Sequence, residues 1–138
     1  MTPRAVAGLI PHTGPMCLLD QVVECNDDYI VCSASSHRAA ANPLRVAGTL
    51  PATAAIEYGA QAMACHGAML GGGAARPGML AAARNIKFSL AQLDQLQGDL
   101  RVIATALARG SDGLVYDFTI DCDGAAVASG RLTVMLAA

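Results

Sequence analysis

The fold is decided by residues 51–70, which read PATAAIEYGAQAMACHGAML. Pro51 suits the first turn of a helix, Thr49 lies close enough to cap it, and Gly71–Gly73 predicts its end. Alanine, isoleucine, methionine and cysteine cover most of the circumference of this helix, so water can reach little of it. The stretch therefore predicts one long, central, buried helix, and its small residues allow a sheet to approach its backbone.

Two strands are predicted before this helix. Met16–Cys25 and Tyr29–Ser36 are rich in leucine, valine and isoleucine, and Asn26–Asp28 between them has the composition of a turn. They are expected to pair as a β-hairpin. Periodicity then disappears over His37–Gly48, which is expected to be a loop, and functional groups are often placed in such loops.

Four strands are predicted after the helix: Leu80–Leu90, Leu100–Leu107, Leu114–Asp121 and Ala126–Met135. Gly110–Gly113 and Asp123-Gly124 look like hairpin turns, so these strands are expected to form a meander with mostly antiparallel pairing. The predicted class is α+β, an antiparallel sheet wrapped around one long helix. The length of 138 residues fits a single domain over residues 1–138.

The composition excludes some functions. A net charge of −2 and a single lysine, Lys87, argue against nucleic-acid binding, which needs clustered cations. Hydrophobic residues make up 54% and charged residues 14% of the chain. So few charged residues for the surface of a monomer favour a buried subunit interface.

No apolar run is long enough to span a membrane, and Met1–Gly8 does not resemble a signal peptide, so a cytoplasmic protein is expected. The five cysteines are odd in number and form no Cys-x-x-Cys pair, which predicts neither a disulfide framework nor a metal site.

Glu57 is the only acidic residue between Tyr29 and Leu93, and it falls in the predicted buried helix. A buried carboxyl group must be hydrogen-bonded, paired with a cation or neutral, and a neutral carboxylic acid can donate a proton. Gln61, four residues later on the same helical face, is expected to orient it. A structural pairing of Glu57 with Arg84 is the alternative.

Three histidines are present. His37 begins the loop before the helix and is either solvated or functional, whereas His12 is expected to be a hydrogen-bonded turn residue. His66 lies nine residues after Glu57, on the opposite helical face, and is the weakest candidate. Because no Gly-x-Ser-x-Gly or cysteine–histidine arrangement is present, covalent catalysis is disfavoured.

Two motifs resemble a known family. Ile10–Asp20 (IPHTGPMCLLD) resembles the Leu-Pro-His, Pro, Leu-Leu, Asp opening of the bacterial (3R)-hydroxyacyl-acyl-carrier-protein dehydratases. Leu50–Ala62 (LPATAAIEYGAQA) resembles their central helix. The resemblance implies a hotdog fold and the dehydration of 3-hydroxyacyl-acyl-carrier-protein thioesters to trans-2-enoyl thioesters.

The resemblance also implies catalytic roles. Glu57 takes the position of the acid that protonates the departing 3-hydroxyl group, while a loop histidine of the other subunit removes the C2 proton. That histidine normally precedes the acid by fourteen residues, where this chain has Pro43. His37 is therefore the expected base, and the chain resembles a divergent subfamily of polyketide-like or aryl-polyene pathways more than of fatty-acid synthesis.

Further residues are expected at the substrate. Backbone N–H groups near Ala52 and Thr53 at the helix start suit the developing thioester oxyanion. Arg38 and Arg45 suit an acidic acyl carrier protein or its pantetheine phosphate. His12 and Gln61 are expected to bind or orient the substrate. The substrate is expected to arrive on the phosphopantetheine of the carrier protein, with no other cofactor.

Three functional hypotheses stay open at this point. The first is a dehydratase that uses Glu57 and His37, and the second is a hotdog acyl thioesterase in which Glu57 directs a water molecule. The third is a non-catalytic subunit that completes the site of a related dehydratase. Each is expected to form a homodimer, or a heterodimer with a related hotdog subunit.

Overall fold

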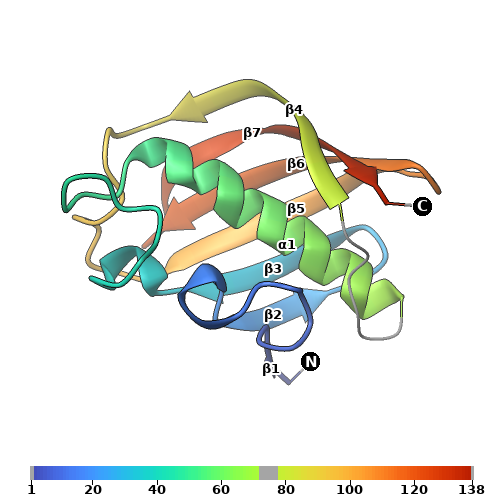
Figure 1. The fold of residues 1–138 in the computed structure, drawn as a ribbon, viewed down its shortest axis with the longest axis horizontal. Coiled ribbons are helices and arrows are strands. Elements are labelled where there is room, and N and C mark those ends of the chain that lie inside the picture. Colours follow the sequence, from blue (N-terminus) through green and yellow to red (C-terminus); the bar gives the residue numbers. More distant parts are fainter. Residues whose placement is uncertain (1, 72–77, 138) are drawn as a thin grey trace.

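The computed structural model describes residues 2–71 and 78–137, in which a seven-stranded sheet covers one side of a single long helix (Figure 1). The helix α1 spans Ala55–Leu70 and follows the short 3-10 turn Ala52–Ala54. Two further 3-10 turns lie at Gly14–Met16 and Ser36–Arg38. The strands are β1 (Arg4–Ala5), β2 (Gln21–Cys25), β3 (Tyr29–Ala34), β4 (Gly78–Phe88), β5 (Leu100–Arg109), β6 (Gly113–Cys122) and β7 (Ala125–Leu136).

The arrangement confirms the predicted α+β hotdog fold, and every pairing in the sheet is antiparallel. The hairpin of β2 and β3 forms as predicted, with the side chain of Asn26 accepting hydrogen bonds from the backbone N–H groups of Asp28 and Tyr29, both at 2.9 Å. The predicted first strand is too long at its start, because Gly14–Met16 forms a 3-10 turn and β2 begins at Gln21. The two-residue β1 is too short to leave a sequence pattern.

The expected four-strand meander is wrong at β4. The strand order is β1-β2-β3-β5-β6-β7-β4, so β4 lies at the edge beside β7, and β5 pairs with β3. The connection over residues 89–99 is long enough to cross the start of the helix, where the Ala52 N–H donates to the Ala91 carbonyl at 2.9 Å and the Leu93 N–H donates to the Leu50 carbonyl at 2.8 Å. This crossing leaves one edge of β4 without a partner among the described residues.

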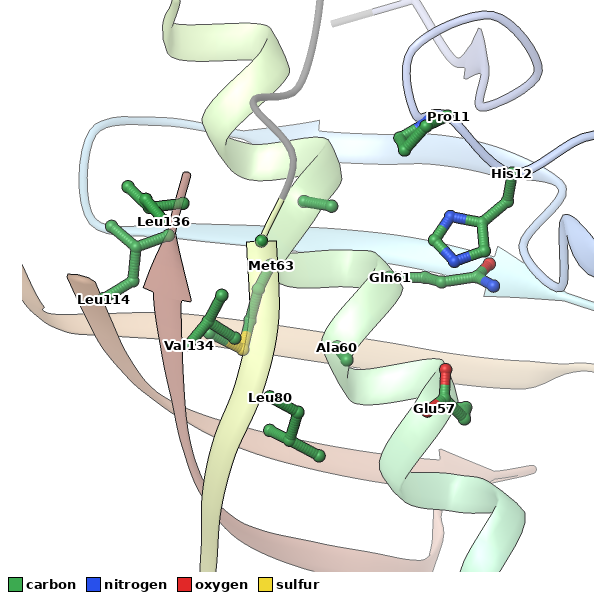
Figure 2. Close-up of a pocket in the computed structure, with 12 residues that line it drawn as sticks. Pro11, His12, Glu57, Ala60, Gln61, Met63, Leu80, Leu114, Val134 and Leu136 are labelled. Atoms are coloured by element: carbon green, nitrogen blue, oxygen red, sulfur yellow. The ribbon is translucent and has the colours of Figure 1, made fainter. Parts of the chain in front are cut away.

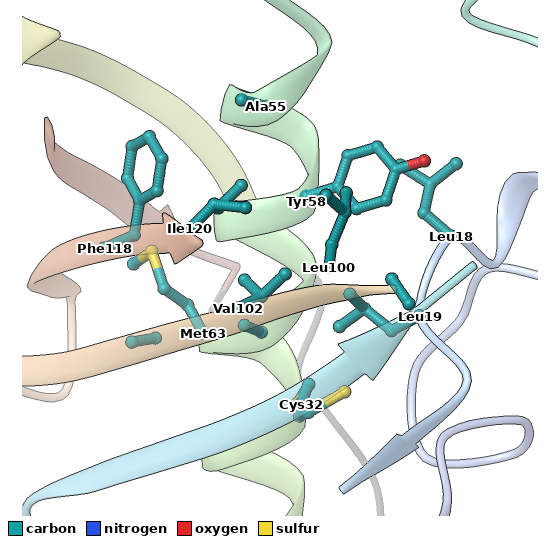
Figure 3. Close-up of a cluster of buried hydrophobic side chains, with 14 of the residues drawn as sticks. Leu18, Leu19, Cys32, Ala55, Tyr58, Met63, Leu100, Val102, Phe118 and Ile120 are labelled. Atoms are coloured by element: carbon teal, nitrogen blue, oxygen red, sulfur yellow. The ribbon is translucent and has the colours of Figure 1, made fainter. Parts of the chain in front are cut away.

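The core lies between α1 and the sheet (Figure 3). Tyr58 and Met63 of the helix are buried there together with Phe118 of β6. Gly59 permits the close approach, since a Cβ atom at this position would lie 2.7 Å from Cγ of Phe118. The other large buried side chains include Leu100, Val102, Ile120 and Leu132.

The burial of α1 is less complete than predicted. Glu57, Ala60 and Ala64 are only half-buried, because they lie on a stripe of the helix that the sheet does not cover. Gly71 ends the helix, with its N–H donating to the Gly67 carbonyl at 2.9 Å, while Gly72 and Gly73 of the predicted helix exit lie outside the described residues. None of the described helices has both the length and the hydropathy that a membrane span requires.

Candidate active site

A cavity of about 200 Å³ lies along the half-buried stripe of α1 (Figure 2). We call it the Glu57 cavity. One end is lined by His12, Gln61 and Glu57, and the other end is lined by Leu114, Val134 and Leu136. One end is thus polar and the other is lined by hydrocarbon, which is the common character of a ligand site. Its other lining residues are Pro11, Ala60, Met63, Ala64, Gly78 and Leu80.

Glu57 lies in the first turn of α1, and its carboxyl group borders the cavity. It has no hydrogen bond or ion pair with any other described residue. The ion pairs found within residues 2–71 and 78–137 are Arg38–Asp99 and Arg131–Asp117, so the alternative pairing of Glu57 with Arg84 is not formed. The carboxyl group is therefore available to a molecule in the cavity.

Gln61 does not orient Glu57, contrary to the expectation from its spacing. Its Oε1 accepts a hydrogen bond from the Leu18 N–H at 2.9 Å, and its Nε2 donates to the Met16 carbonyl at 2.7 Å. The side chain is 1% exposed. Gln61 therefore fastens the N-terminal segment (residues 6–20) to the helix, and this segment carries His12.

His12 borders the cavity together with Glu57. Its Nδ1 is shielded from solvent and has no hydrogen-bond partner among the described residues. The expected hydrogen bond of a turn histidine through this atom is thus not formed. Because buried polar atoms in native proteins are nearly always paired, the free Nδ1 points to a partner that arrives with a ligand.

His37 does not reach the Glu57 cavity. It is fully buried in the 3-10 turn Ser36–Arg38, and its Nε2 lies 3.2 Å from the Leu96 carbonyl and 3.0 Å from the Gly98 carbonyl. Carbonyl oxygens only accept, so Nε2 carries the proton and donates to both. His37 thus joins two loops. Its Nδ1 is also buried without a partner among the described residues, but His37 does not line the Glu57 cavity, so the structure gives no support to its expected role as the base there.

The remaining predicted site residues also lie outside the cavity lining. The Ala52 N–H donates to the Ala91 carbonyl, and neither Ala52 nor Thr53 lines the Glu57 cavity. Arg38 donates to the Gln97 carbonyl and pairs with Asp99 at 2.6 Å.

Arg45 is similarly occupied. It donates to the Ala39 carbonyl at 2.8 Å and the Gly48 carbonyl at 2.7 Å, so both predicted carrier-protein arginines shape loops.

The loop in which the family histidine is expected is held firmly. The Tyr58 hydroxyl lies 2.6 Å from Oγ of Ser36 and accepts a hydrogen bond from Nδ2 of Asn42 at 3.1 Å. Pro43 follows on the exposed side of this loop. The loop thus carries Pro43, and not a histidine, fourteen residues before Glu57.

Sequence reasoning missed the apolar end of the cavity. Leu114, Val134 and Leu136 come from β6 and β7, and Leu80 comes from β4. Their alternating pattern predicts strands, but it does not say which strand ends meet the helix. The position of β4 beside β7 brings them together.

His66 is structural, as its helical face predicted. Its Nε2–H donates to the Asn26 carbonyl at 2.7 Å, and its Nδ1 accepts from the Tyr116 hydroxyl at 2.5 Å. Burial lowers the pKa of His66 below its ordinary value. Burial, helped by the neighbouring Arg38 cation, also lowers the pKa of His37.

We expect the folded state to lose stability in mild acid. Below the unfolded pKa of about 6.5, the unfolded chain binds protons on His37 and His66 that the folded chain does not bind, so unfolding takes up protons. The free energy of unfolding, measured with urea, should fall from about pH 7 to about pH 5. His66→Gln, which keeps a donor and an acceptor, should weaken this dependence. A flat or rising stability toward pH 5 would contradict the prediction.

Comparisons with known proteins agree with the fold. The family described as ApeP dehydratase matches residues 4–138. The dehydratase heterocomplex ApeI:P from Xenorhabdus doucetiae aligns with a TM-score of 0.85 and 26% identity, over 97% of this chain and 91% of that chain. No curated protein sequence matches.

More distant structures show the fold alone. A hypothetical thioesterase with coenzyme A from Streptococcus pneumoniae TIGR4 aligns with a TM-score of 0.60 and 17% identity, over 84% of each chain. AziG from S. sahachiroi aligns with a TM-score of 0.61 and 18% identity, over 84% of this chain and 89% of that chain.

Proposed function

The chain belongs to the ApeP dehydratase family, and on this premise we propose that it acts in the dehydration of 3-hydroxyacyl thioesters to trans-2-enoyl thioesters. One observation carries the proposal: the carboxyl group of Glu57, which pairs with no other described residue, borders a cavity whose far end is hydrocarbon. A substrate with a polar reacting end and an apolar chain matches both ends of this cavity.

The reaction needs two proton transfers. A base removes a proton from C2, and the electrons of that C–H bond form the C2–C3 double bond as the C3–O bond breaks. A proton donor converts the departing hydroxyl group to water. Glu57 is proposed as this donor, because its carboxyl group is not engaged by another described residue and general acids act within hydrogen-bond reach of the leaving atom.

A related hotdog subunit is the proposed partner. In support of this, ApeP-type chains occur with ApeI in the heterocomplex from Xenorhabdus doucetiae. On the edge strand β4, Met79 is 73% exposed, and Leu80 and Phe88 are also exposed. Apolar side chains along a sheet edge are expected where another subunit covers that edge. The pathway proposed is of the aryl-polyene type, with the acyl chain carried on acyl carrier protein.

A non-catalytic role is the second candidate. Pro43 occupies the position at which the dehydratases resembled by the sequence carry their histidine, and His37 is held away from the cavity. On this reading the chain completes the site of the partner subunit and is inactive alone.

The test is an assay of 3-hydroxyoctanoyl-N-acetylcysteamine thioester with the chain alone, with an ApeI-type subunit alone and with both together. We expect enoyl thioester, detected by mass spectrometry, without release of free thiol. Activity that appears only with both subunits favours the shared-site form of the proposal. Release of free thiol without enoyl product, or no contribution of this chain to dehydration, would overturn it.

A further inference from the structure

The Glu57 cavity contains a second group able to transfer protons. Among the described residues that line it, only His12 and Glu57 carry acid–base side chains. His12 is held there indirectly, because Gln61 fastens Met16 and Leu18 of the same N-terminal segment to α1.

Neither of the other two histidines can serve this cavity. His37 donates through Nε2 to the Leu96 and Gly98 carbonyls, and it is fully buried. His66 is also fully buried, and both of its nitrogens are engaged by Asn26 and Tyr116. The shielded Nδ1 of His12 has no partner among the described residues, as is also true of Nδ1 of His37. His12 differs from both other histidines because it alone of the three lines the Glu57 cavity.

His12 also borders the outside of the molecule. Besides the Glu57 cavity, it lines an open hollow of about 730 Å³, together with Thr13, Asp20, Gln21 and Asp99. His12 thus borders both the Glu57 cavity and an open surface. A proton that the ring collects inside the cavity has a short route to water.

We propose that His12 is the base of this site and removes the C2 proton of the thioester, so that base and acid come from one chain. The inference rests on the proposed function. The C2–H electrons form the C2=C3 bond, the C3–O bond breaks, and Glu57 gives its proton to the leaving oxygen, which departs as water. The imidazolium then releases its proton to water at the open hollow, and Glu57 takes one up, which restores both groups.

The first test compares two histidine variants in the complex with an ApeI-type subunit. The measured quantity is the part of the dehydration rate of 3-hydroxyoctanoyl-N-acetylcysteamine thioester that depends on Glu57, which is the rate of the wild-type complex minus that of Glu57→Gln. His12→Asn should lower this rate by about 10²- to 10⁴-fold without lowering the unfolding temperature. His37→Asn should lower the unfolding temperature but keep the rate per folded molecule.

The second test isolates proton removal from the departure of water. Octanoyl-N-acetylcysteamine thioester has no 3-hydroxyl group, so in D₂O the base alone can exchange its C2 hydrogens, which mass spectrometry detects. The wild-type complex and Glu57→Gln should catalyse this exchange, His12→Asn should not, and added imidazole should restore part of it in His12→Ala.

The outcomes separate the two proposals. If Glu57→Gln lowers dehydration but His12→Asn keeps both dehydration and exchange, the inference is wrong and the base belongs to the partner subunit. If wild type and Glu57→Gln dehydrate equally, the proposed function of Glu57 itself fails. Loss of exchange in His37→Asn, with exchange kept in His12→Asn, would assign the base to His37 and overturn the inference.

Discussion

Glu57→Gln is expected to lower kcat for dehydration by about 10²- to 10⁴-fold, the usual contribution of a positioned general acid. The amide has nearly the same shape as the carboxyl group but cannot supply an acidic proton to the departing hydroxyl group. The carboxyl group has no hydrogen bond or ion pair with other described residues, so its removal should leave the free energy of unfolding almost unchanged. KM should also change little, since the apolar end of the cavity holds the acyl chain.

The matched control is Glu24→Gln, the same chemical change at the other glutamate of the chain. Glu24 is exposed on β2 and interacts with Tyr29, away from the cavity lining. It should leave kcat unchanged. Equal dehydration rates for Glu57→Gln and wild type in the complex would show that Glu57 is not the proton donor.

Gln61→Leu is expected to destabilise the fold by about 2–3 kcal/mol, because it leaves the buried Leu18 N–H without its acceptor and the partly buried Met16 carbonyl without its donor. Leucine is close to glutamine in size, so lost hydrogen bonding and not a cavity causes the effect. Urea unfolding measures the difference. The dehydration rate per folded molecule should also fall, since the segment that carries His12 is no longer fastened to α1.

Gln95→Leu serves as the control for this substitution. Gln95 is exposed, and its amide makes only a 3.3 Å hydrogen bond to the side chain of Gln92. Surface changes of this kind usually alter stability by less than about 0.5 kcal/mol. A comparably small effect for Gln61→Leu would mean that the N-terminal segment is held by other contacts.

The helix and the strands could be predicted from sequence because each leaves a local pattern. The Pro51–Leu70 prediction matches the observed 3-10 turn and α1, and the Asn26–Asp28 turn joins β2 to β3. The pairing of β4 with β7 could not be predicted, since alternation gives the face of a strand but not its neighbour. The expected meander failed for this reason.

The site was predicted in part. Glu57 stood out because no other acid lies near it in sequence, and it does border a cavity. The partners of Gln61 and His37 were missed because they lie far away along the chain: Gln61 bonds Met16 and Leu18, and His37 bonds the 96–98 loop. Such contacts depend on the finished fold and leave no local signal.

The most direct test of the central claim is a crystal structure of the chain with an ApeI-type subunit and a 3-hydroxyoctanoyl pantetheine amide, in which nitrogen replaces the thioester sulfur. We expect the 3-hydroxyl oxygen within about 2.6–3.2 Å of the Glu57 carboxyl group, with the acyl chain directed toward Leu114 and Leu136. A bound analogue that contacts neither Glu57 nor the lining of its cavity would contradict the account.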